Sequence, residues 1–231
     1  MQSRPIIDVI IPAYNEEDAI GLVLDEIPKA LVRNVIVSNN NSTDETAAVA
    51  EKHGATVVFE PKAGYGNACL KAMDLIAKQE VKPDIVVFLD GDHSDYPEEL
   101  KEVVLPIMQG EADLVIGSRA LGKSESGSLT PQQVFGNWLA TRLLKMFYGV
   151  KFTDLGPFRA IRYESLLQLN MADRNYGWTV EMQIKAAKMK MKCVEVPVNY
   201  RVRIGQSKVS GTVKGTIGAG YKIILTLFKY L

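Results

Sequence analysis

The sequence has few residues that could cross-link the chain or bind a metal through sulfur or imidazole. It contains two cysteines and two histidines among 231 residues. Cys69 and Cys193 lie far apart without metal-ligand spacing. We therefore expect both thiols to be reduced, buried and inert, as in a cytosolic protein.

Long apolar segments are also missing. No run approaches the roughly 20 residues that a membrane-spanning helix needs, and the longest late candidate covers only residues 223–228. The N-terminus has no signal-peptide pattern. These absences predict a cytoplasmic protein without a membrane span.

The chain carries no net charge, because 27 basic side chains balance 27 acidic ones. Without a basic excess, general nucleic-acid binding is disfavoured. The charges are nevertheless unevenly distributed, since residues 185–231 contain ten basic side chains and one acidic side chain, Glu195. This basic end predicts contact with phosphate or an anionic membrane surface; the alternative is a solvated face that balances the acidic half.

The first half of the chain alternates between apolar runs typical of strands and segments typical of helices. This order predicts an α/β fold with a mostly parallel sheet, helices on both faces, and ligands at the carboxyl ends of the strands. A capping box over residues 42–45 is expected to open one helix. The predicted strands cover residues 6–11, 35–38, 56–60, 85–89 and 114–117, and the predicted helices cover residues 18–27, 42–54, 67–78 and a segment from residue 97.

The second half begins with a Gly- and Ser-rich stretch, residues 122–130, which predicts a mobile loop. Thr130 and Pro131 then form the expected start of a helix. No linker separates two domains, so we expect residues 1–231 to form a single domain with a short accessory helical C-terminal part. The remaining predicted elements are helices at residues 130–148, 164–169, 179–191 and 212–231, and a strand at residues 193–198.

Asp90-Gly91-Asp92 directly follows a predicted buried strand. Two carboxylates there are costly to desolvate, and a divalent cation would offset that cost while leaving coordination sites for a diphosphate. Gly91 is expected to let the backbone turn and to keep bulk away from a ligand. The pattern predicts Mg²⁺ or Mn²⁺ bound by Asp90 and Asp92; the alternative is an ordinary strand-end turn. Nearby Asp95 is expected to cap the next helix.

Several short motifs occur in order along nearly the whole chain. They are Ile11-Pro12-Ala13-Tyr14-Asn15-Glu16-Glu17, Ser42-Thr43-Asp44, Gly64-Tyr65-Gly66, Asp90-Gly91-Asp92, Gly117-Ser118-Arg119, Asp154-Leu155-Gly156-Pro157-Phe158-Arg159, Gly177-Trp178-Thr179-Val180-Glu181 and residues 201–208. With these motifs in this order, the chain resembles family 2 glycosyltransferases of the GT-A (Rossmann-like) fold. The later motifs resemble the polyprenyl-phosphate hexose synthases, such as dolichyl-phosphate mannose and glucose synthases.

The resemblance implies that residues 1–120 bind a nucleoside-diphosphate sugar. Tyr14 offers a stacking surface, and Glu16 can accept hydrogen bonds from ribose hydroxyls. The alternative for both is a segment that caps the first helix. The residues implied in nucleotide-sugar binding are Pro12, Ala13, Tyr14, Glu16, Asn40, Lys62, Gly64, Asp90 and Gly91.

Asn40 departs from the family pattern, in which two aspartates and a glycine usually precede Ser-Thr-Asp. An amide both donates and accepts hydrogen bonds, whereas a carboxylate only accepts. Contact with the base is still expected, but UDP-glucose and GDP-mannose both stay open as donors. The alternative is that residues 39–41 form a plain turn.

The resemblance also implies that residues 121–231 bind a polyprenyl or dolichyl phosphate, to which the hexose is transferred with inversion. A phosphate monoester is mostly ionised near neutral pH and has little need of a strong general base. Cations are expected to converge on the phosphates, although some could pair with surface carboxylates instead. Glu181 would orient sugar hydroxyls or hold an arginine. The implied catalytic residues are Asp92, Arg119, Arg203 and Lys208, and the implied acceptor-binding residues are Arg119, Arg142, Arg159, Glu181, Ser207 and Lys208.

Trp138, Arg142 and Lys145 share one face of the helix predicted at residues 130–148. Aromatic and basic groups mixed with apolar ones suit a membrane interface. We therefore expect this amphipathic helix and the terminal one to attach the protein peripherally to the cytoplasmic face of a membrane. The alternative is that both helices pack on the sheet and direct their cations to water.

Other functions fit parts of the pattern. A glycosyltransferase could use a glycan or a small phosphorylated acceptor instead of a lipid. A sugar nucleotidyltransferase would usually show a Gly-rich, Arg- or Lys-bearing segment after the first strand, where this chain has Pro12 to Glu16. A non-catalytic nucleotide-sugar binding protein would not need the acidic pair. The sequence makes no prediction about the oligomeric state.

Overall fold

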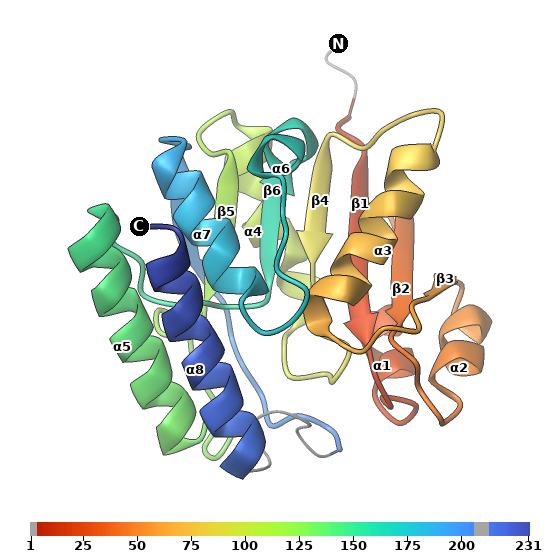
Figure 1. Ribbon diagram of the computed structural model, residues 1–231. Helices are drawn as coiled ribbons and strands as arrows, with labels where there is room; N and C mark the ends of the chain where they lie inside the picture. The colour runs from red at the N-terminus through yellow and green to blue at the C-terminus, as the bar shows by residue number, and fades with distance from the viewer. Residues whose placement is uncertain (1–3, 206–212) are drawn as a thin grey trace.

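The computed structural model of the protein describes residues 4–205 and 213–231. These residues form one seven-stranded sheet in the order β3-β2-β1-β4-β6-β5-β7 (Figure 1). Neighbouring strands are parallel except where β6 pairs with β4 and β5. The mostly parallel α/β sheet predicted from the sequence is confirmed. The strands are β1 (Ile7–Ala13), β2 (Asn34–Asn39), β3 (Thr56–Phe59), β4 (Ile85–Phe88), β5 (Leu114–Ser118), β6 (Arg159–Arg162) and β7 (Cys193–Pro197).

Helices cover both faces of the sheet, as predicted. Successive residues of a strand point to opposite faces, so β1 places Ile10 in one core and Val9 and Ile11 in the other. Helices α3, α5, α6, α7 and α8 cover the face of Ile10, and α1, α2 and α4 cover the opposite face. The helices are α1 (Ile20–Glu26), α2 (Thr46–Lys52), α3 (Tyr65–Lys78), the 3₁₀ turn η1 (Pro97–Glu99), α4 (Leu100–Met108), α5 (Pro131–Tyr148), α6 (Tyr163–Leu169), α7 (Trp178–Lys188) and α8 (Val213–Lys229).

Strand β6 is an element that the sequence does not predict. Only Ala160 and Ile161 separate its two arginines, so it has neither an apolar run nor a clear alternation. It forms because β4 and β5 both pair with it in the antiparallel direction. This reversal brings residues 153–158, which precede β6, to the carboxyl ends of β4 and β5.

The start of α2 also differs from the prediction. The helix begins at Thr46, and its N-cap residue, Glu45, makes no side-chain capping hydrogen bond. Asp44 Oδ1 accepts a hydrogen bond from the backbone N of Thr46 at 3.1 Å. Ser42 Oγ instead accepts a hydrogen bond from the backbone N of Asn15 at 3.0 Å, and Asp44 Oδ2 accepts one from the backbone N of Glu17 at 3.3 Å. These side chains hold the loop after β1 beside the loop after β2.

Helix α5 begins as predicted, because Thr130 and Gln133 exchange capping hydrogen bonds. It lies beside α8 at one end of the sheet (Figure 1). The preceding stretch, predicted to be a mobile loop, pairs its backbone with Tyr200 at Lys123 and Glu125. Within the described residues, no helix is long and apolar enough to cross a membrane.

Candidate active site

A pocket of about 410 Å³ opens at the carboxyl ends of β1, β2 and β4. This edge is where open α/β sheets bind ligands. Most residues that the sequence analysis assigned to the donor and the metal line this pocket. They are Pro12, Ala13, Tyr14, Glu16, Asn40, Gly64, Asp90, Gly91 and Asp92. Arg203, which was assigned a catalytic role, lines the same pocket.

Asp90 and Asp92 place two carboxylates in the pocket. Tyr65, at the start of α3, donates its hydroxyl to Asp90 Oδ1 at 3.1 Å, a contact that the sequence analysis did not identify. Burial, and then the charge of Asp92, raise the pKa of Asp90 to about 7. A bound cation would stabilise the ionised form, so this acidic pair fits a divalent ion.

The two carboxylate oxygens of Asp92 have different partners. Oδ1 accepts hydrogen bonds from the backbone N of Ser94 at 3.0 Å and from the Ser94 hydroxyl. Oδ2 pairs with Nη1 of Arg203 at 3.0 Å, while Nη2 of the same guanidinium pairs with Glu16 Oε1 at 3.1 Å. Arg203 therefore bridges the acidic pair and the segment after β1.

Asp95 does not cap the following helix, which corrects the sequence-based interpretation. Tyr96 occupies the N-cap position of η1. The Asp95 carboxylate is 2% exposed, and neither of its oxygens has a hydrogen-bond partner among the described residues. Burial, and then the charges of Asp90 and Asp92, raise its pKa well above the usual value. Asp95 is therefore a third, buried carboxylate of this acidic cluster.

Gly91 is not needed for a backbone turn, contrary to the expectation. It is not one of the glycines with positive φ. A Cβ built on Gly91 would lie 3.4 Å from Ile11 and from Ile20, which is ordinary van der Waals contact. The missing side chain would therefore face the core between β1 and α1 rather than a ligand.

Tyr14 and Glu16 lie in the segment between β1 and α1 and line the pocket. The Tyr14 side chain is 44% exposed, which leaves its ring available for stacking. The Glu16 carbonyl accepts a hydrogen bond from the backbone N of Ile20 at 2.8 Å, while its side chain pairs with Arg203. For Glu16, contact with a ligand and a contact that holds the start of α1 are therefore compatible.

Asn40 uses both ends of its amide to hold the loop that leads to α3. Its Nδ2 donates to the carbonyls of Glu60 at 3.1 Å and Lys62 at 2.7 Å, and its Oδ1 accepts from the backbone N of Gly64 at 2.8 Å. A carboxylate could not make the two donor contacts. This geometry gives a physical reason for an amide at the position where the family pattern has aspartate. The Lys62 side chain is exposed and does not line the pocket.

Another backbone segment passes so close to Gly64 and Gly66 that neither position has room for a side chain. A Cβ on Gly64 or Gly66 would lie 2.2 or 2.1 Å from a carbonyl oxygen of residues 173–174. Gly64 also has a φ of 140°, which side chains rarely adopt. The contact brings Asn175 and Tyr176 into the pocket. Both lie outside the motifs, so the sequence analysis did not identify them.

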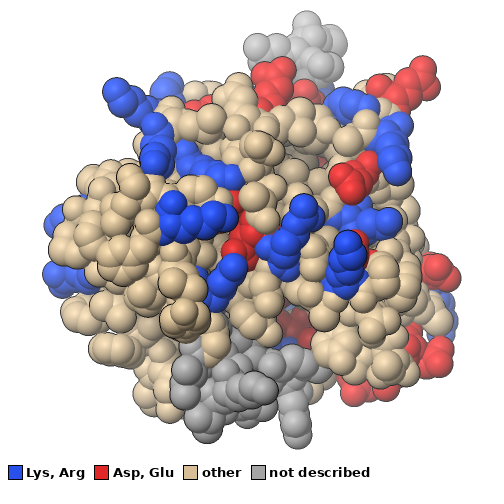
Figure 2. Space-filling view, in the orientation of Figure 1, with Lys and Arg blue, Asp and Glu red and all other residues tan. Residues whose placement is uncertain are grey.

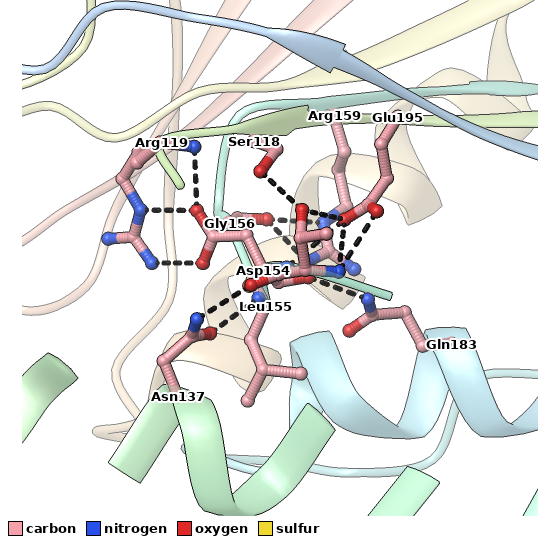
Figure 3. Close-up of polar contacts among 10 residues, drawn as sticks. Ser118, Arg119, Asn137, Asp154, Leu155, Gly156, Arg159, Gln183 and Glu195 are labelled. Atoms are coloured by element: carbon pink, nitrogen blue, oxygen red, sulfur yellow. Dashed lines mark hydrogen bonds and ion pairs between the residues drawn. The ribbon is translucent and has the colours of Figure 1, made fainter. Parts of the chain in front are cut away.

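Arg119 is held by Asp154 (Figure 3). Its Nε and Nη2 pair with the two Asp154 oxygens at 2.8 and 2.7 Å, and its backbone N donates to Oδ2 at 2.8 Å. The guanidinium also lies over the Tyr200 ring, 5.0 Å from its centroid. Burial alone would lower the Arg119 pKa, but the hydrogen bonds and charge of Asp154 raise it. Arg119 is therefore a fixed cation, whose Nη1 makes no hydrogen bond within the described residues.

Three elements anchor the segment that carries Asp154 (Figure 3). Glu195 in β7 accepts a hydrogen bond from the Asp154 backbone N at 3.1 Å. Asn137 in α5 accepts one from the Leu155 backbone N at 2.9 Å, and Gln183 in α7 donates to the Asp154 carbonyl at 2.9 Å. The position of Arg119 is thus set through Asp154 by most of the second half of the chain.

Arg159 does not face the pocket, and the expected phosphate contact is wrong for this arrangement. The residue is 0% exposed. Its Nε donates to the carbonyl of Gly156 at 3.0 Å, Nη2 to that of Leu155 at 2.8 Å, and Nη1 to that of Thr179 at 3.0 Å. Burial lowers its pKa to about 10. Because every guanidinium nitrogen is engaged by a carbonyl, Arg159 joins the Asp154 segment to α7.

Glu181 is also buried, and neither of its expected roles is found. Its carboxylate is 0% exposed and accepts a hydrogen bond from the backbone N of Asp173 at 2.7 Å. It also pairs with Lys185 at 2.8 Å and accepts the Tyr230 hydroxyl. Burial would raise the Glu181 pKa, but these hydrogen bonds and the Lys185 charge lower it. Glu181 thus joins α7 to the C-terminal residues and to the loop before α7.

Arg142, another acceptor-side candidate, does not line the pocket. Arg142 is exposed on α5, and its guanidinium lies 5.5 Å from the centroid of the Trp138 ring. Ser207 and Lys208 lie outside the described residues, so their roles stay predictions.

A large pocket at the carboxyl edge of a mostly parallel sheet, with an acidic pair and a guanidinium inside it, is typical of α/β proteins that bind nucleotides. The model of the family described as "Glycosyl transferase family 2" matches residues 8–169. This match covers more than half of the chain. The chain therefore belongs to glycosyl transferase family 2 and is a glycosyltransferase.

Similar proteins agree with this assignment. An uncharacterised glycosyltransferase of Mycobacterium tuberculosis is 37% identical over 213 residues, covering 91% of this chain and 93% of the relative. A dolichyl-phosphate hexose transferase of Haloferax volcanii is 31% identical over 204 residues, covering 87% of this chain and 85% of the relative. Glucosyl-3-phosphoglycerate synthase of M. tuberculosis, solved with Mn²⁺, UDP-glucose and phosphoglyceric acid, has a TM-score of 0.76 at 24% identity, covering 98% of this chain and 79% of that chain. This structural similarity confirms the GT-A fold.

Proposed function

We propose that the protein transfers a hexose from a nucleoside-diphosphate sugar to a polyprenyl or dolichyl phosphate, with inversion and with Mg²⁺ or Mn²⁺. One observation carries this proposal: Asp90, Asp92 and Arg203 line the same pocket as Tyr14 and Glu16. A diphosphate bound between a metal-holding acidic pair and a guanidinium would direct its nucleoside toward the segment after β1. Membership of glycosyl transferase family 2 favours glycosyl transfer over nucleotidyl transfer or simple binding.

The residues present fit a divalent cation. Asp90 and Asp92 supply two carboxylates, and their mutual repulsion is the kind that a cation removes. In the described part of the chain, no three His, Cys, Asp or Glu side chains are arranged to hold a metal. The other ligands would therefore come from the donor diphosphate and water, as is common for Mg²⁺. A bound cation would neutralise charge on the departing diphosphate.

The transfer breaks the bond between the anomeric carbon and the nucleoside diphosphate. An acceptor phosphate oxygen forms the new bond to this carbon from the opposite side. That oxygen is already ionised near neutral pH, so no strong base is required. In keeping with this, neither His53 nor His93 lines the pocket, and both pair with carboxylates elsewhere. Arg119, whose Nη1 makes no hydrogen bond in the part of the chain that the structure describes, is the cation that we assign to the acceptor phosphate.

A lipid acceptor is supported by the surface of α5 and α8. Phe135, Trp138 and Met146 are between 50 and 65% exposed on α5, and Tyr221 is 65% exposed on α8. The two helices contain basic residues and no acidic ones. In Figure 2 the area of α5, on the left, is mainly tan with blue. An apolar, aromatic and basic surface of this kind suits an anionic membrane. The lipid-linked activity in the name of the 31% identical relative points the same way.

Product formation tests the proposal. UDP-glucose and GDP-mannose would each be supplied with undecaprenyl phosphate, dolichyl phosphate or 3-phosphoglycerate, with Mg²⁺ or Mn²⁺. We expect labelled sugar to enter the organic phase with one donor and a polyprenyl phosphate, and to require the metal. Transfer to phosphoglycerate alone would contradict the lipid acceptor, and release of free sugar-1-phosphate would contradict glycosyl transfer. Asp92→Asn is the matched inactive control.

A further inference from the structure

Arg203 pairs with the carboxylate oxygen of Asp92 that a bound metal ion would use as a ligand. Ser94 already engages Asp92 Oδ1 through its backbone N and its hydroxyl. The other oxygen, Oδ2, pairs with Arg203 at 3.0 Å. A cation that uses Asp92 as a ligand therefore meets one oxygen committed to a local turn and one committed to an arginine. Of these two, the ion pair is the one that a stronger cation can replace.

We propose that Arg203 is the counter-ion of the acidic pair in the metal-free protein. A bound metal ion displaces its guanidinium from Asp92, and the guanidinium then binds the donor diphosphate. This inference rests on the proposed function, because it requires a metal at Asp92. Without metal, Arg203 compensates the charge of Asp92 and Glu16 and spans part of the pocket. With metal and donor, the released guanidinium finds a new anionic partner in the diphosphate.

The contacts of Arg203 are looser than those of Arg119, the other cation beside the cluster. Arg119 makes three hydrogen bonds to the single carboxylate of Asp154. Arg203 divides its contacts between Asp92 and Glu16, and its Nε is buried without a hydrogen-bond partner among the described residues. Its side chain is also 27% exposed, against 15% for Arg119. Arg203 is therefore the guanidinium that can exchange partners at lower cost.

The backbone around Arg203 allows the exchange to be a side-chain movement. On one side, the backbone N of Arg201 donates to the carbonyl of Ser94 at 2.9 Å, and its side chain donates to the carbonyls of His93 and Asp95 at 2.7 and 3.0 Å. On the other side, the backbone N of residue 204 donates to the carbonyl of residue 92 at 3.0 Å. Residue 203 is thus held next to the acidic turn while its guanidinium can change partners.

Displacement predicts opposite effects on two ligands when Arg203 is replaced. Metal alone should bind more tightly, because it no longer competes with the guanidinium for Asp92. Nucleoside diphosphate in the presence of metal should bind more weakly, because a phosphate contact is lost. A residue that merely stabilises the fold would weaken both, and a plain phosphate ligand would leave metal alone unchanged.

The test is a titration with Mn²⁺ followed by electron paramagnetic resonance, without nucleotide and then with UDP or GDP. We expect Arg203→Gln and Arg203→Ala to bind Mn²⁺ about two- to fivefold more tightly than the unchanged protein, the range of one partly exposed ion pair. Both variants should bind the diphosphate about tenfold more weakly. Lys101→Ala, which removes an exposed charge on α4, should change neither affinity. Circular dichroism would verify that every variant is folded.

Unchanged or weaker Mn²⁺ binding by both Arg203 variants would overturn the counter-ion role. Asp92→Asn separates this failure from failure of the proposed function. If Asp92→Asn loses Mn²⁺ while the Arg203 variants match the unchanged protein, the metal site stands and only the counter-ion is wrong. If Asp92→Asn binds Mn²⁺ normally, or if the unchanged protein does not bind it, both the metal site and the counter-ion are wrong.

Discussion

At the residue scale, Asn40 decides the shape of the loop between β3 and α3 through three hydrogen bonds. We predict that Asn40→Asp, although it restores the residue type usual in the family, weakens donor binding. The carboxylate loses two donor contacts and faces two carbonyl oxygens, which should cost about 1–3 kcal/mol of unfolding free energy. Thermal unfolding and nucleotide titration measure the two effects. An Asn40→Asp protein of unchanged stability would refute the role that we give to the amide.

The acidic pair predicts a pH-dependent metal affinity. Because burial and Asp92 raise the pKa of Asp90 to about 7, Asp90 is protonated below that pH in the metal-free protein. A metal must displace this proton, so Mn²⁺ affinity should rise up to about tenfold per pH unit below pH 7 and level off above it. In the metal-free protein, Asp90 holds a proton in the native state in the same pH range, whereas the unfolded chain has lost it. The free energy of unfolding should therefore fall as the pH rises through this range.

Asp90→Asn provides the comparison for this pH profile. The variant retains an oxygen at the same place but has no proton to exchange. We expect the variant to bind Mn²⁺ more weakly than the unchanged protein. Its Mn²⁺ affinity should also depend much less on pH between pH 5 and 7. A wild-type affinity that is independent of pH over this interval would show that Asp90 is not the titrating ligand.

We predict that position 91 tolerates the small side chain of alanine. An added methyl group would make ordinary contacts with Ile11 and Ile20, and no unusual backbone angle would oppose it. Gly91→Ala should therefore change the melting temperature by no more than a few degrees and leave Mn²⁺ binding within about twofold. Gly66→Ala is the contrasting variant, because its Cβ would lie 2.1 Å from the Asp173 carbonyl. Equal losses in the two variants would contradict these packing assignments.

The sequence located the donor side of the site better than the acceptor side. Motif residues after β1 and β4 were correctly placed in one pocket, because strand ends in a parallel sheet meet at one edge. Arg159 and Glu181 were misassigned, because sequence alone does not reveal that both side chains are fully buried. The contact of Tyr65 with Asp90 was not predicted, because it joins residues that lie far apart in the sequence.

At the scale of elements, α5 presents the surface that we assign to the membrane. Replacing Phe135 and Trp138 together by serine should lower binding to phosphatidylglycerol vesicles by at least about tenfold, because each inserted aromatic side chain contributes on the order of 1–2 kcal/mol. Binding of the unchanged protein should also weaken as salt is added. Vesicle sedimentation measures both.

Helix α4 supplies the matched control. Leu105 and Met108 are 41 and 42% exposed, and α4 covers the opposite face of the sheet. Replacing both by serine should leave vesicle binding unchanged. If the α4 variant loses binding as strongly as the α5 variant, the loss reflects general hydrophobicity and not a defined surface.

Secondary structure was predictable where local chemistry determines it. Thr130 and Pro131 were expected to start α5, and the structure agrees with this expectation, with Gln133 completing the contacts within one turn. Residues 42–45 carry a similar pattern but use their side chains to hold the neighbouring loop after β1. Strand β6 depends on two partners distant in sequence. Tertiary contacts, which the local pattern does not contain, decided both of these cases.

At the scale of the whole molecule, the pocket takes residues from both halves of the chain. Tyr14, Asn40 and Asp90 come from the first half, whereas Tyr176 and Arg203 come from the second. The expected division into a nucleotide-sugar half and an acceptor half is therefore not strict. If the pocket binds the donor as proposed, the second half also contacts the donor, and we expect ligand binding to stabilise the whole domain and not only its first half.

The central claim is that Asp90 and Asp92 hold a divalent cation together with the donor diphosphate. A crystal structure with Mn²⁺ and UDP or GDP, with data collected at the manganese absorption edge, tests it most directly. We predict an anomalous peak about 2.0–2.4 Å from an oxygen of Asp90 or Asp92 and from the diphosphate, with the nucleoside beside Tyr14. A well-occupied nucleotide elsewhere, or a peak distant from both carboxylates, would contradict the claim.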